Sequence, residues 1–141
     1  MYIYGMTDAV GMGGHKHTIL VIEDEEVMRS VLADKLRKEG LGVIQAKDGA
    51  QGLEKAQLNK PDLILLDNRM PSMGGYEMIR RLRESGPWGE HVPVIFFTNV
   101  EIGSSAEKAD IESTGALHYL VKSETSLDSA VQKIKEVLKV A

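Results

Sequence analysis

The feature that most constrains the fold is a regular alternation of short apolar runs with amphipathic segments from residue 18 onward. The runs "TILVIE", "GVIQA", "DLILLD", "VPVIFFT" and "ALHYLV" are rich in β-branched and large apolar residues, as buried strands are. No hairpin turn separates them, so parallel strands joined by right-handed crossover helices are predicted. We therefore expect a doubly wound α/β domain, in which a five-stranded parallel sheet carries helices on both faces and "DLILLD" lies centrally.

Apolar residues at helical spacing predict the helices and their inward faces. Asp48 and Ser126 precede two of these segments and are predicted N-caps. The segment from Ser105 to Ser113 has a thin apolar face, which predicts low local stability and a segment that can shift. The residues predicted to face inward, in chain order, are Val27, Met28, Val31, Leu32, Leu36, Ala50, Leu53, Ala56, Met78, Ile79, Leu82, Ala106, Ala109, Ile111, Leu127, Val131, Ile134, Val137 and Leu138.

Composition and net charge indicate the cellular location of the chain and the classes of partner that it binds. Residues 1–17 contain four glycines and no sustained period, so we expect a flexible leader or tag before a domain over 18–141. The chain has no cysteine and no signal-peptide pattern, and its apolar runs are too short to span a bilayer, which favours a cytoplasmic location. A net charge of -4 argues against nucleic acid as a partner, and no basic amphipathic helix indicates membrane binding.

Polar residues follow four of the five predicted strands. Glu23-Asp24 ends the first strand, Asp67 the third, Thr98-Asn99 the fourth and Lys122 the fifth. Taken singly, each of these residues has an ordinary structural explanation. Acids stabilise the N-terminus of a helix, Asp is common in turns, Thr is common in strands, and a lysine is usually solvated. Taken together, they lie at the carboxyl edge of one parallel sheet, where ligands bind in open α/β folds. Carboxylates suit Mg²⁺, and a carboxylate can accept a phosphoryl group whose oxygens a hydroxyl and an ammonium then bind.

The segments "ILVIEDEEVMR", "LILLDNRMPSMGGYEMIRRLR", "PVIFFTN" and "GALHYLVKS" resemble the response regulator receiver domain of two-component signalling, over about residues 18–140. The resemblance implies a flavodoxin-like (βα)5 fold with strand order 2-1-3-4-5. It implies a stand-alone phospho-acceptor that depends on Mg²⁺, with Mn²⁺ able to substitute, and that catalyses only its own phosphorylation and dephosphorylation. The implied partners are a sensor histidine kinase or phosphotransfer protein upstream and an unknown protein target, or a second copy, downstream.

The resemblance also assigns roles to individual residues. Asp67 matches the phosphorylated aspartate, Asp24 the direct metal ligand and Glu23 a second acid that reaches the metal through water. The Arg69 backbone carbonyl matches a further metal ligand, and Lys122 matches the lysine that pairs with Asp67 or its phosphate. Thr98 and Tyr119 match the switch pair that moves on phosphorylation, and the fourth helix, fifth strand and last helix match the signalling face. A half-buried tyrosine with its hydroxyl in water is the simpler reading of Tyr119.

This chain departs from the family pattern at several positions. Gly74 replaces a common acid, and Asn99 replaces a small residue, where its amide either narrows phosphate access or contacts the phosphoryl group. Arg69 and Val100 stand where the family controls water access, and we expect them to slow dephosphorylation. Ser123 replaces the proline after Lys122, and because a cis bond costs more without proline, we expect a trans Lys122-Ser123 bond.

Two other functions remain open at this stage. The departures allow a degenerate receiver that binds a partner without being phosphorylated. A flavodoxin-like cofactor binder or a small hydrolase shares the topology. Against the second alternative, acids stand where a glycine-rich phosphate loop would follow the first strand, and no Ser-His-Asp order is present.

Overall fold

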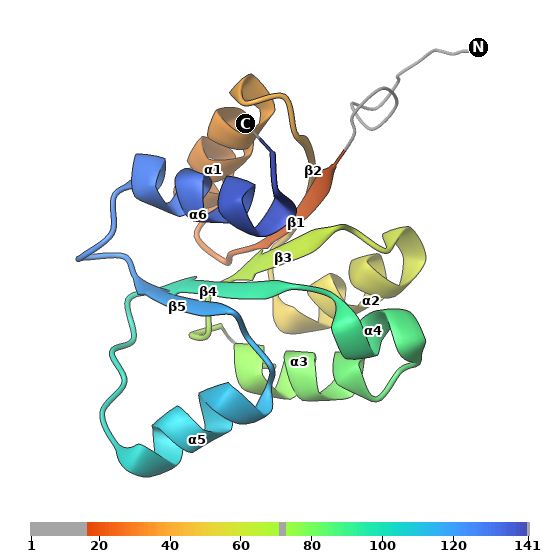
Figure 1. Cartoon of the computed structure of the whole chain (residues 1–141), viewed down its shortest axis with the longest axis vertical. Coiled ribbons are helices and arrows are strands. Elements are labelled where there is room, and N and C mark those ends of the chain that lie inside the picture. Colours follow the sequence, from red (N-terminus) through yellow and green to blue (C-terminus); the bar gives the residue numbers. More distant parts are fainter. Residues whose placement is uncertain (1–16, 71–72, 141) are drawn as a thin grey trace.

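The computed structural model describes residues 17–70 and 73–140, which form one five-stranded sheet with helices on both sides (Figure 1). The strands pair in parallel in the order β2-β1-β3-β4-β5, which confirms the predicted fold class and places β3 at the centre. Their bounds are β1 Thr18–Ile22, β2 Gly42–Ala46, β3 Leu63–Leu66, β4 Val94–Thr98 and β5 His118–Val121.

The helices divide between the two faces of the sheet. On one face α1 (Glu26–Lys38) and α6 (Leu127–Leu138) pack over a core cluster that includes Leu36 and Ile134. On the other face α2 (Gly49–Asn59) and α3 (Gly75–Arg83) cover a second cluster around Phe96. Because both faces are buried, every residue of β3 and β4 is apolar except Thr98, which is itself fully buried.

Local side-chain hydrogen bonds fix where several helices begin. The Asp48 carboxylate accepts from the Gln51 backbone N–H, and the Ser126 hydroxyl accepts from the Ser129 N–H, so both predicted N-caps are confirmed. Ser104 caps α5 (Ser105–Ser113) in the same way through the Glu107 N–H. Each of these caps satisfies one of the unpaired N–H groups that a helix start leaves.

Several predicted inward faces are wrong in detail. Val27 is 72% and Val31 40% exposed, because α1 turns the row of Leu32, Ala33 and Leu36 toward the sheet. Ala50 is also exposed, and Gly52 and Ala56 make the buried row of its helix. The spacing of apolar residues identifies a helix, but the rotation of the helix about its own axis decides which row of side chains faces the sheet.

The fourth predicted helix is barely anchored. Within α5 only Ile111 is buried, whereas Ala106 and Ala109 are exposed, so the expected apolar face is narrower than predicted. Figure 1 shows α5 standing away from the sheet beside β5. Because so few of its residues are buried, α5 is still predicted to have low local stability.

The chain also has a short helix that the sequence pattern does not predict. α4 (Pro87–His91) begins with a proline after Gly86, whose φ of 132° only glycine adopts readily. It places Trp88 against the core cluster on the α3 side, so this tryptophan anchors the loop. Among the helices of the described residues, none is long and apolar enough to cross a membrane.

Candidate functional site

Backbone pairing brings the predicted polar residues to one edge of the sheet. The Asp67 N–H donates to the Ile22 carbonyl at 3.1 Å, so the residue after β3 lies beside the end of β1. The Lys122 N–H donates to the Thr98 carbonyl at 2.7 Å, which aligns the ends of β4 and β5 in the same way. The side chains that follow these strands therefore converge, as the parallel arrangement predicts.

An ion-pair network joins Lys122 to two carboxylates. Its Nζ lies 2.5 Å from Glu23 Oε1 and 3.3 Å from Asp67 Oδ2. The Lys122 side chain is 9% exposed, as is that of Asp67, and that of Glu23 is 3% exposed. Lys122 is therefore not a solvated surface charge, because it compensates two carboxylates that are nearly removed from water.

The environment shifts the pKa of both members of the closer pair. Burial raises the pKa of Glu23 above its ordinary value, and the hydrogen bonds from Lys122 and from the Glu25 N–H only partly oppose this effect. For Lys122 burial acts to lower the pKa, but Glu23 and Asp67 together raise it. The ammonium is thus held charged, and the pKa of Glu23 is the one that desolvation raises.

Asp24 completes an acidic cluster at the mouth of the site. It is exposed, and one carboxylate oxygen from each of Glu23, Asp24 and Asp67 lies within 4.8 Å of the other two. Three carboxylates facing a single lysine leave a net negative charge, which an added cation would neutralise. Oxygen ligands on an open, partly hydrated site are what Mg²⁺ prefers, so these residues fit that ion.

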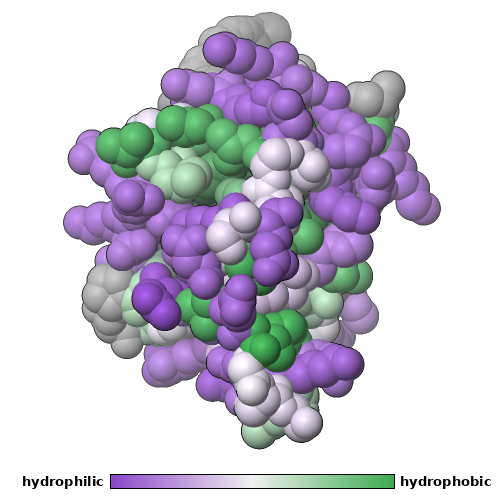
Figure 2. Space-filling view, turned by 90° about the vertical axis from the view of Figure 1, so that its left-hand side faces the viewer, coloured by the Kyte–Doolittle hydropathy of each residue, from purple (hydrophilic) through white to green (hydrophobic). Residues whose placement is uncertain are grey.

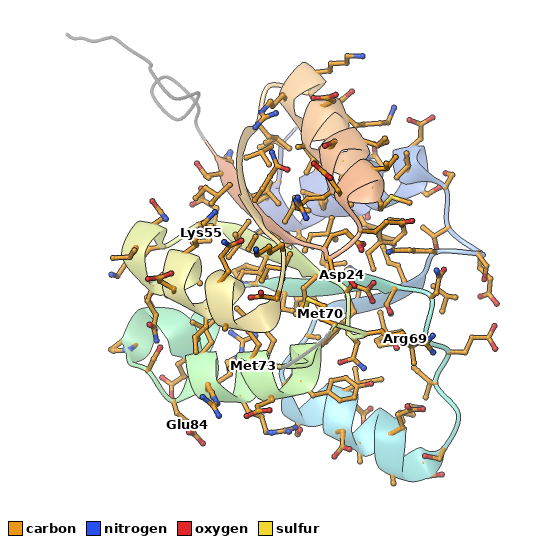
Figure 3. All side chains as sticks on the ribbon, turned by 180° about the vertical axis from the view of Figure 1, so that it is seen from behind. Asp24, Lys55, Arg69, Met70, Met73 and Glu84 are labelled. Atoms are coloured by element: carbon orange, nitrogen blue, oxygen red, sulfur yellow. The ribbon has the colours of Figure 1, made fainter. Side chains whose placement is uncertain are left out.

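These side chains border an open cleft of about 680 Å³. Figure 3 shows Asp24, Arg69 and Met70 at this end of the molecule, whereas Lys55 and Glu84 lie toward the other end. Figure 2 views the same end, where hydrophilic residues occupy the middle and an apolar patch lies above them. The residues lining the cleft are Glu23, Asp24, Glu25, Asp67, Arg69, Met70, Asn99 and Lys122.

The loop after β3 is fixed at both of its described ends. The Arg69 N–H donates to Asp67 Oδ1 at 3.0 Å and so orients the carboxylate. The Asn68 side-chain oxygen accepts from the Tyr76 N–H, and the Asn68 backbone carbonyl accepts from the Gly75 N–H. A Cβ at Gly75 would lie 3.0 Å from both Asn68 Cα and the Phe96 ring, so glycine permits this close approach. Gly74 is the extended N-cap of α3 and provides no side-chain cap. Pro71, which follows Met70 in the segment "LILLDNRMPSMGGYEMIRRLR", lies outside the described residues.

The predicted switch residues lie just beneath the cleft. Thr98 is fully buried, and its hydroxyl oxygen accepts from the Val100 N–H at 3.2 Å. Tyr119 is half-buried, and its hydroxyl donates to the Val100 carbonyl at 2.6 Å, so it has a protein partner. The structure places Asn99 and Arg69 on the cleft wall, and Val100 is not among the lining residues.

The peptide bond after Lys122 has the expected geometry. Every peptide bond within residues 17–70 and 73–140 is trans, including Lys122-Ser123. The Lys122 side chain still reaches both carboxylates, with its Nζ 5.9 Å from the centre of the Phe97 ring. Proline at residue 123 is therefore not required to aim this lysine.

Comparison with known proteins agrees with this geometry. The family model of the response regulator receiver domain matches residues 19–135. The chain belongs to that family. Receiver domains are phospho-acceptor signalling domains of two-component systems, and they bind Mg²⁺ at an acidic pocket such as the one formed here.

Individual relatives span different lengths. The sensor kinase/phosphatase CqsS of Vibrio cholerae is 33% identical over 77% of this receiver but only 16% of its own length. The transcriptional regulatory protein PdtaR of Mycobacterium tuberculosis is 30% identical over 84% of the receiver and 58% of its own length. The receiver thus spans less than two thirds of either protein.

Solved structures match over nearly their whole length. The chemotaxis response regulator CheY4 of Vibrio cholerae superposes with a TM-score of 0.76 at 26% identity, covering 86% of this receiver and 98% of that chain. A putative response regulator from Chloroflexus aurantiacus gives 0.75 at 28% identity, over 87% and 98%.

Sequence reasoning missed several contacts within the receiver site. It paired Lys122 with Asp67, but the closer partner is Glu23. It did not identify Arg29, whose Nη1 donates to the Glu23 carbonyl at 2.9 Å and holds the β1–α1 turn in place. Asn68 is the other missed residue, although its position directly after Asp67 was a usable signal.

Proposed function

We propose that this receiver accepts a phosphoryl group on Asp67 in a Mg²⁺-dependent reaction and signals through a protein partner. The observation that carries the proposal is the buried network in which one lysine bridges Glu23 and Asp67 at the wall of an acidic, open cleft. An ion pair of this kind is costly to bury, so a purely structural domain gains little from keeping it. A phospho-acceptor needs both the nucleophile and the cation in this place.

The proposed reaction uses residues on the cleft wall. An Asp67 carboxylate oxygen attacks the phosphorus of the donor, and the bond between phosphorus and the donor's leaving group breaks. Glu23, Asp24, Asp67 and the Arg69 carbonyl would hold Mg²⁺, directly or through water, and when bound the ion neutralises charge on the phosphoryl oxygens. Lys122 is 3.3 Å from Asp67 and is positioned to move its ammonium onto a phosphoryl oxygen.

Two hydrogen bonds support a route from the site to the signalling face. The Thr98 hydroxyl accepts from the Val100 N–H, and the Val100 carbonyl accepts from Tyr119. If the Thr98 hydroxyl turns toward a phosphoryl oxygen, the Val100 N–H loses its acceptor and the loop before α5 is released. Tyr119 then loses its own partner, and the weakly anchored α5 shifts with β5 and α6.

The upstream partner is proposed to dock beside the cleft. Val27 and Val31 are exposed on successive turns of α1, which begins directly after the acidic residues of the site. Exposed aliphatic residues next to a polar reaction centre suit a helical histidine kinase or phosphotransfer protein, which packs there while presenting its phosphohistidine.

Water access to the acyl phosphate is proposed to depend on the cleft wall. Arg69 and Asn99 line the cleft, so Arg69 can screen the phosphoryl group and the Asn99 amide can contact it. Val100 acts through the loop that it anchors to Thr98 and Tyr119. Slow dephosphorylation is the expected consequence.

Incubation with acetyl phosphate and Mg²⁺ tests the proposed function. Intact mass should rise by one phosphoryl group, and peptide mapping should place it on Asp67. Chelation of the metal should abolish the gain. A degenerate receiver would show no gain under either condition. Asn99, Gly74 and Ser123 are the residues that favour this alternative.

A further inference from the structure

One buried hydroxyl beneath the cleft has no hydrogen-bond partner. Among the described residues, Tyr76 Oη is the single buried side-chain nitrogen or oxygen without one. A buried donor that is left unpaired raises the free energy of the conformation that contains it, so it calls for a physical explanation. Nothing in the proposed reaction uses this group.

Tyr76 connects the phosphorylation loop to the predicted switch tyrosine. Its backbone N–H donates to Asn68 Oδ1, directly after Asp67. The Tyr76 ring packs edge-on against Phe96, with the ring centroids 5.6 Å apart. Phe96 also contacts the ring of Tyr119, whose centroid lies 5.5 Å from that of Phe96. The three aromatic rings thus come from α3, β4 and β5 and form one cluster on the α3 side of the sheet.

The two tyrosine hydroxyls lie close enough for each to influence the other. Burial is the largest cause that raises the pKa of Tyr76 and of Tyr119, and each also influences the pKa of the other, so both are protonated donors at neutral pH. The Tyr119 hydroxyl donates to the Val100 carbonyl at 2.6 Å, whereas Tyr76 Oη has no hydrogen-bond partner. In this conformation the Val100 carbonyl is therefore already engaged by Tyr119.

We propose that Tyr76 is a second member of the conformational switch, whose hydroxyl gains a partner when Tyr119 turns away from Val100. The partner is the released Val100 carbonyl or a water molecule that enters the space that Tyr119 leaves. This inference rests on the proposed function, because phosphorylation of Asp67 is what moves Tyr119. Tyr76 is a positioning residue, since its hydroxyl contacts neither the phosphoryl donor nor Asp67.

The proposal predicts opposite effects for two matched substitutions. Tyr76→Phe keeps the ring contact with Phe96 and removes a bond that exists only in the phosphorylated conformation. It should not lower the stability of the unphosphorylated protein, and it should slow phosphorylation by acetyl phosphate about fivefold, the factor of one net hydrogen bond. Tyr119→Phe removes a bond of the unphosphorylated conformation, so it should lower the urea midpoint of that protein and should not slow phosphorylation.

Urea unfolding of the unphosphorylated proteins and intact-mass time courses with acetyl phosphate and Mg²⁺ make the test. The proposal is overturned if wild type is phosphorylated and Tyr76→Phe reacts at the same rate. It is also overturned if Tyr76→Phe lowers the urea midpoint as Tyr119→Phe does, because the hydroxyl would then have a partner already. If wild type itself gains no phosphoryl group, the proposed function fails, and this inference fails with it.

Discussion

Replacing Lys122 with methionine removes the lysine that forms ion pairs with two nearly buried carboxylates. At an effective dielectric of about 20, the attractions over 2.5 Å and 3.3 Å are roughly 7 and 5 kcal/mol. The variant also avoids desolvating the ammonium, which offsets several kcal/mol of that loss. We expect Lys122→Met to lower the free energy of unfolding by about 3–5 kcal/mol at pH 8, the range found when one partner of a buried pair is removed.

The effect of this substitution should depend on pH through Glu23. Because the pKa of Glu23 is raised in the folded state, its contribution to stability is present below its ordinary value of 4.5 and is lost as pH rises through the folded value. Without the ammonium the folded pKa rises further, so the variant keeps losing stability at higher pH. The difference between wild type and variant should therefore widen from pH 5 to pH 8.

Urea unfolding followed by circular dichroism measures this difference, since domains of this size usually unfold in two states. Lys133→Met is the control. The Lys133 side chain is 43% exposed and its Nζ lies 3.6 Å from a Glu136 carboxylate oxygen on α6, so this variant should unfold close to wild type. An equal difference at pH 5 and pH 8, or a loss no greater than that of the control, would refute the reasoning about the buried network.

Three further substitutions test other parts of the structure. Gly49→Ala would drive its Cβ against the Met73 backbone carbonyl, and unfolding should show a loss of about 1–3 kcal/mol. Arg69→Ser opens the cleft wall, so the phosphorylated protein should lose its phosphoryl group faster in an intact-mass time course; an unchanged or longer lifetime would count against shielding. Val27→Ser should slow phosphotransfer from a cognate kinase but not from acetyl phosphate, whereas Leu58→Ser, which changes a side chain 75% exposed on α2, should slow neither.

The parallel sheet and its functional edge could be predicted from sequence because both follow from local patterns. Uninterrupted apolar runs identify strands buried on both faces, and the absence of hairpins makes those strands parallel. Once they are parallel, the residues after each strand must share an edge, so Asp67 and Lys122 were placed together without any knowledge of their contacts. The trans bond before Ser123 followed from the intrinsic cost of a cis bond.

The remaining features depend on distances that the sequence does not contain. Lys122 lies 2.5 Å from Glu23 and 3.3 Å from Asp67, and which carboxylate is nearer depends on the packing of three side chains from different strand ends. Val27 is exposed because of the rotation of α1 about its own axis, which helical spacing leaves open. The unpaired hydroxyl of Tyr76 arises only when α3, β4 and β5 are packed together, so no local pattern predicts it.

The central claim is that Asp67 is the phospho-acceptor of a Mg²⁺-dependent receiver, and intact-mass spectrometry with acetyl phosphate tests it most directly. We predict that wild type gains one phosphoryl group with Mg²⁺ and none after chelation, that Asp67→Asn gains none, and that Asp24→Asn needs a higher Mg²⁺ concentration. A wild-type protein that gains no mass, or an Asp67→Asn variant that gains the same mass at the same rate, would contradict the account.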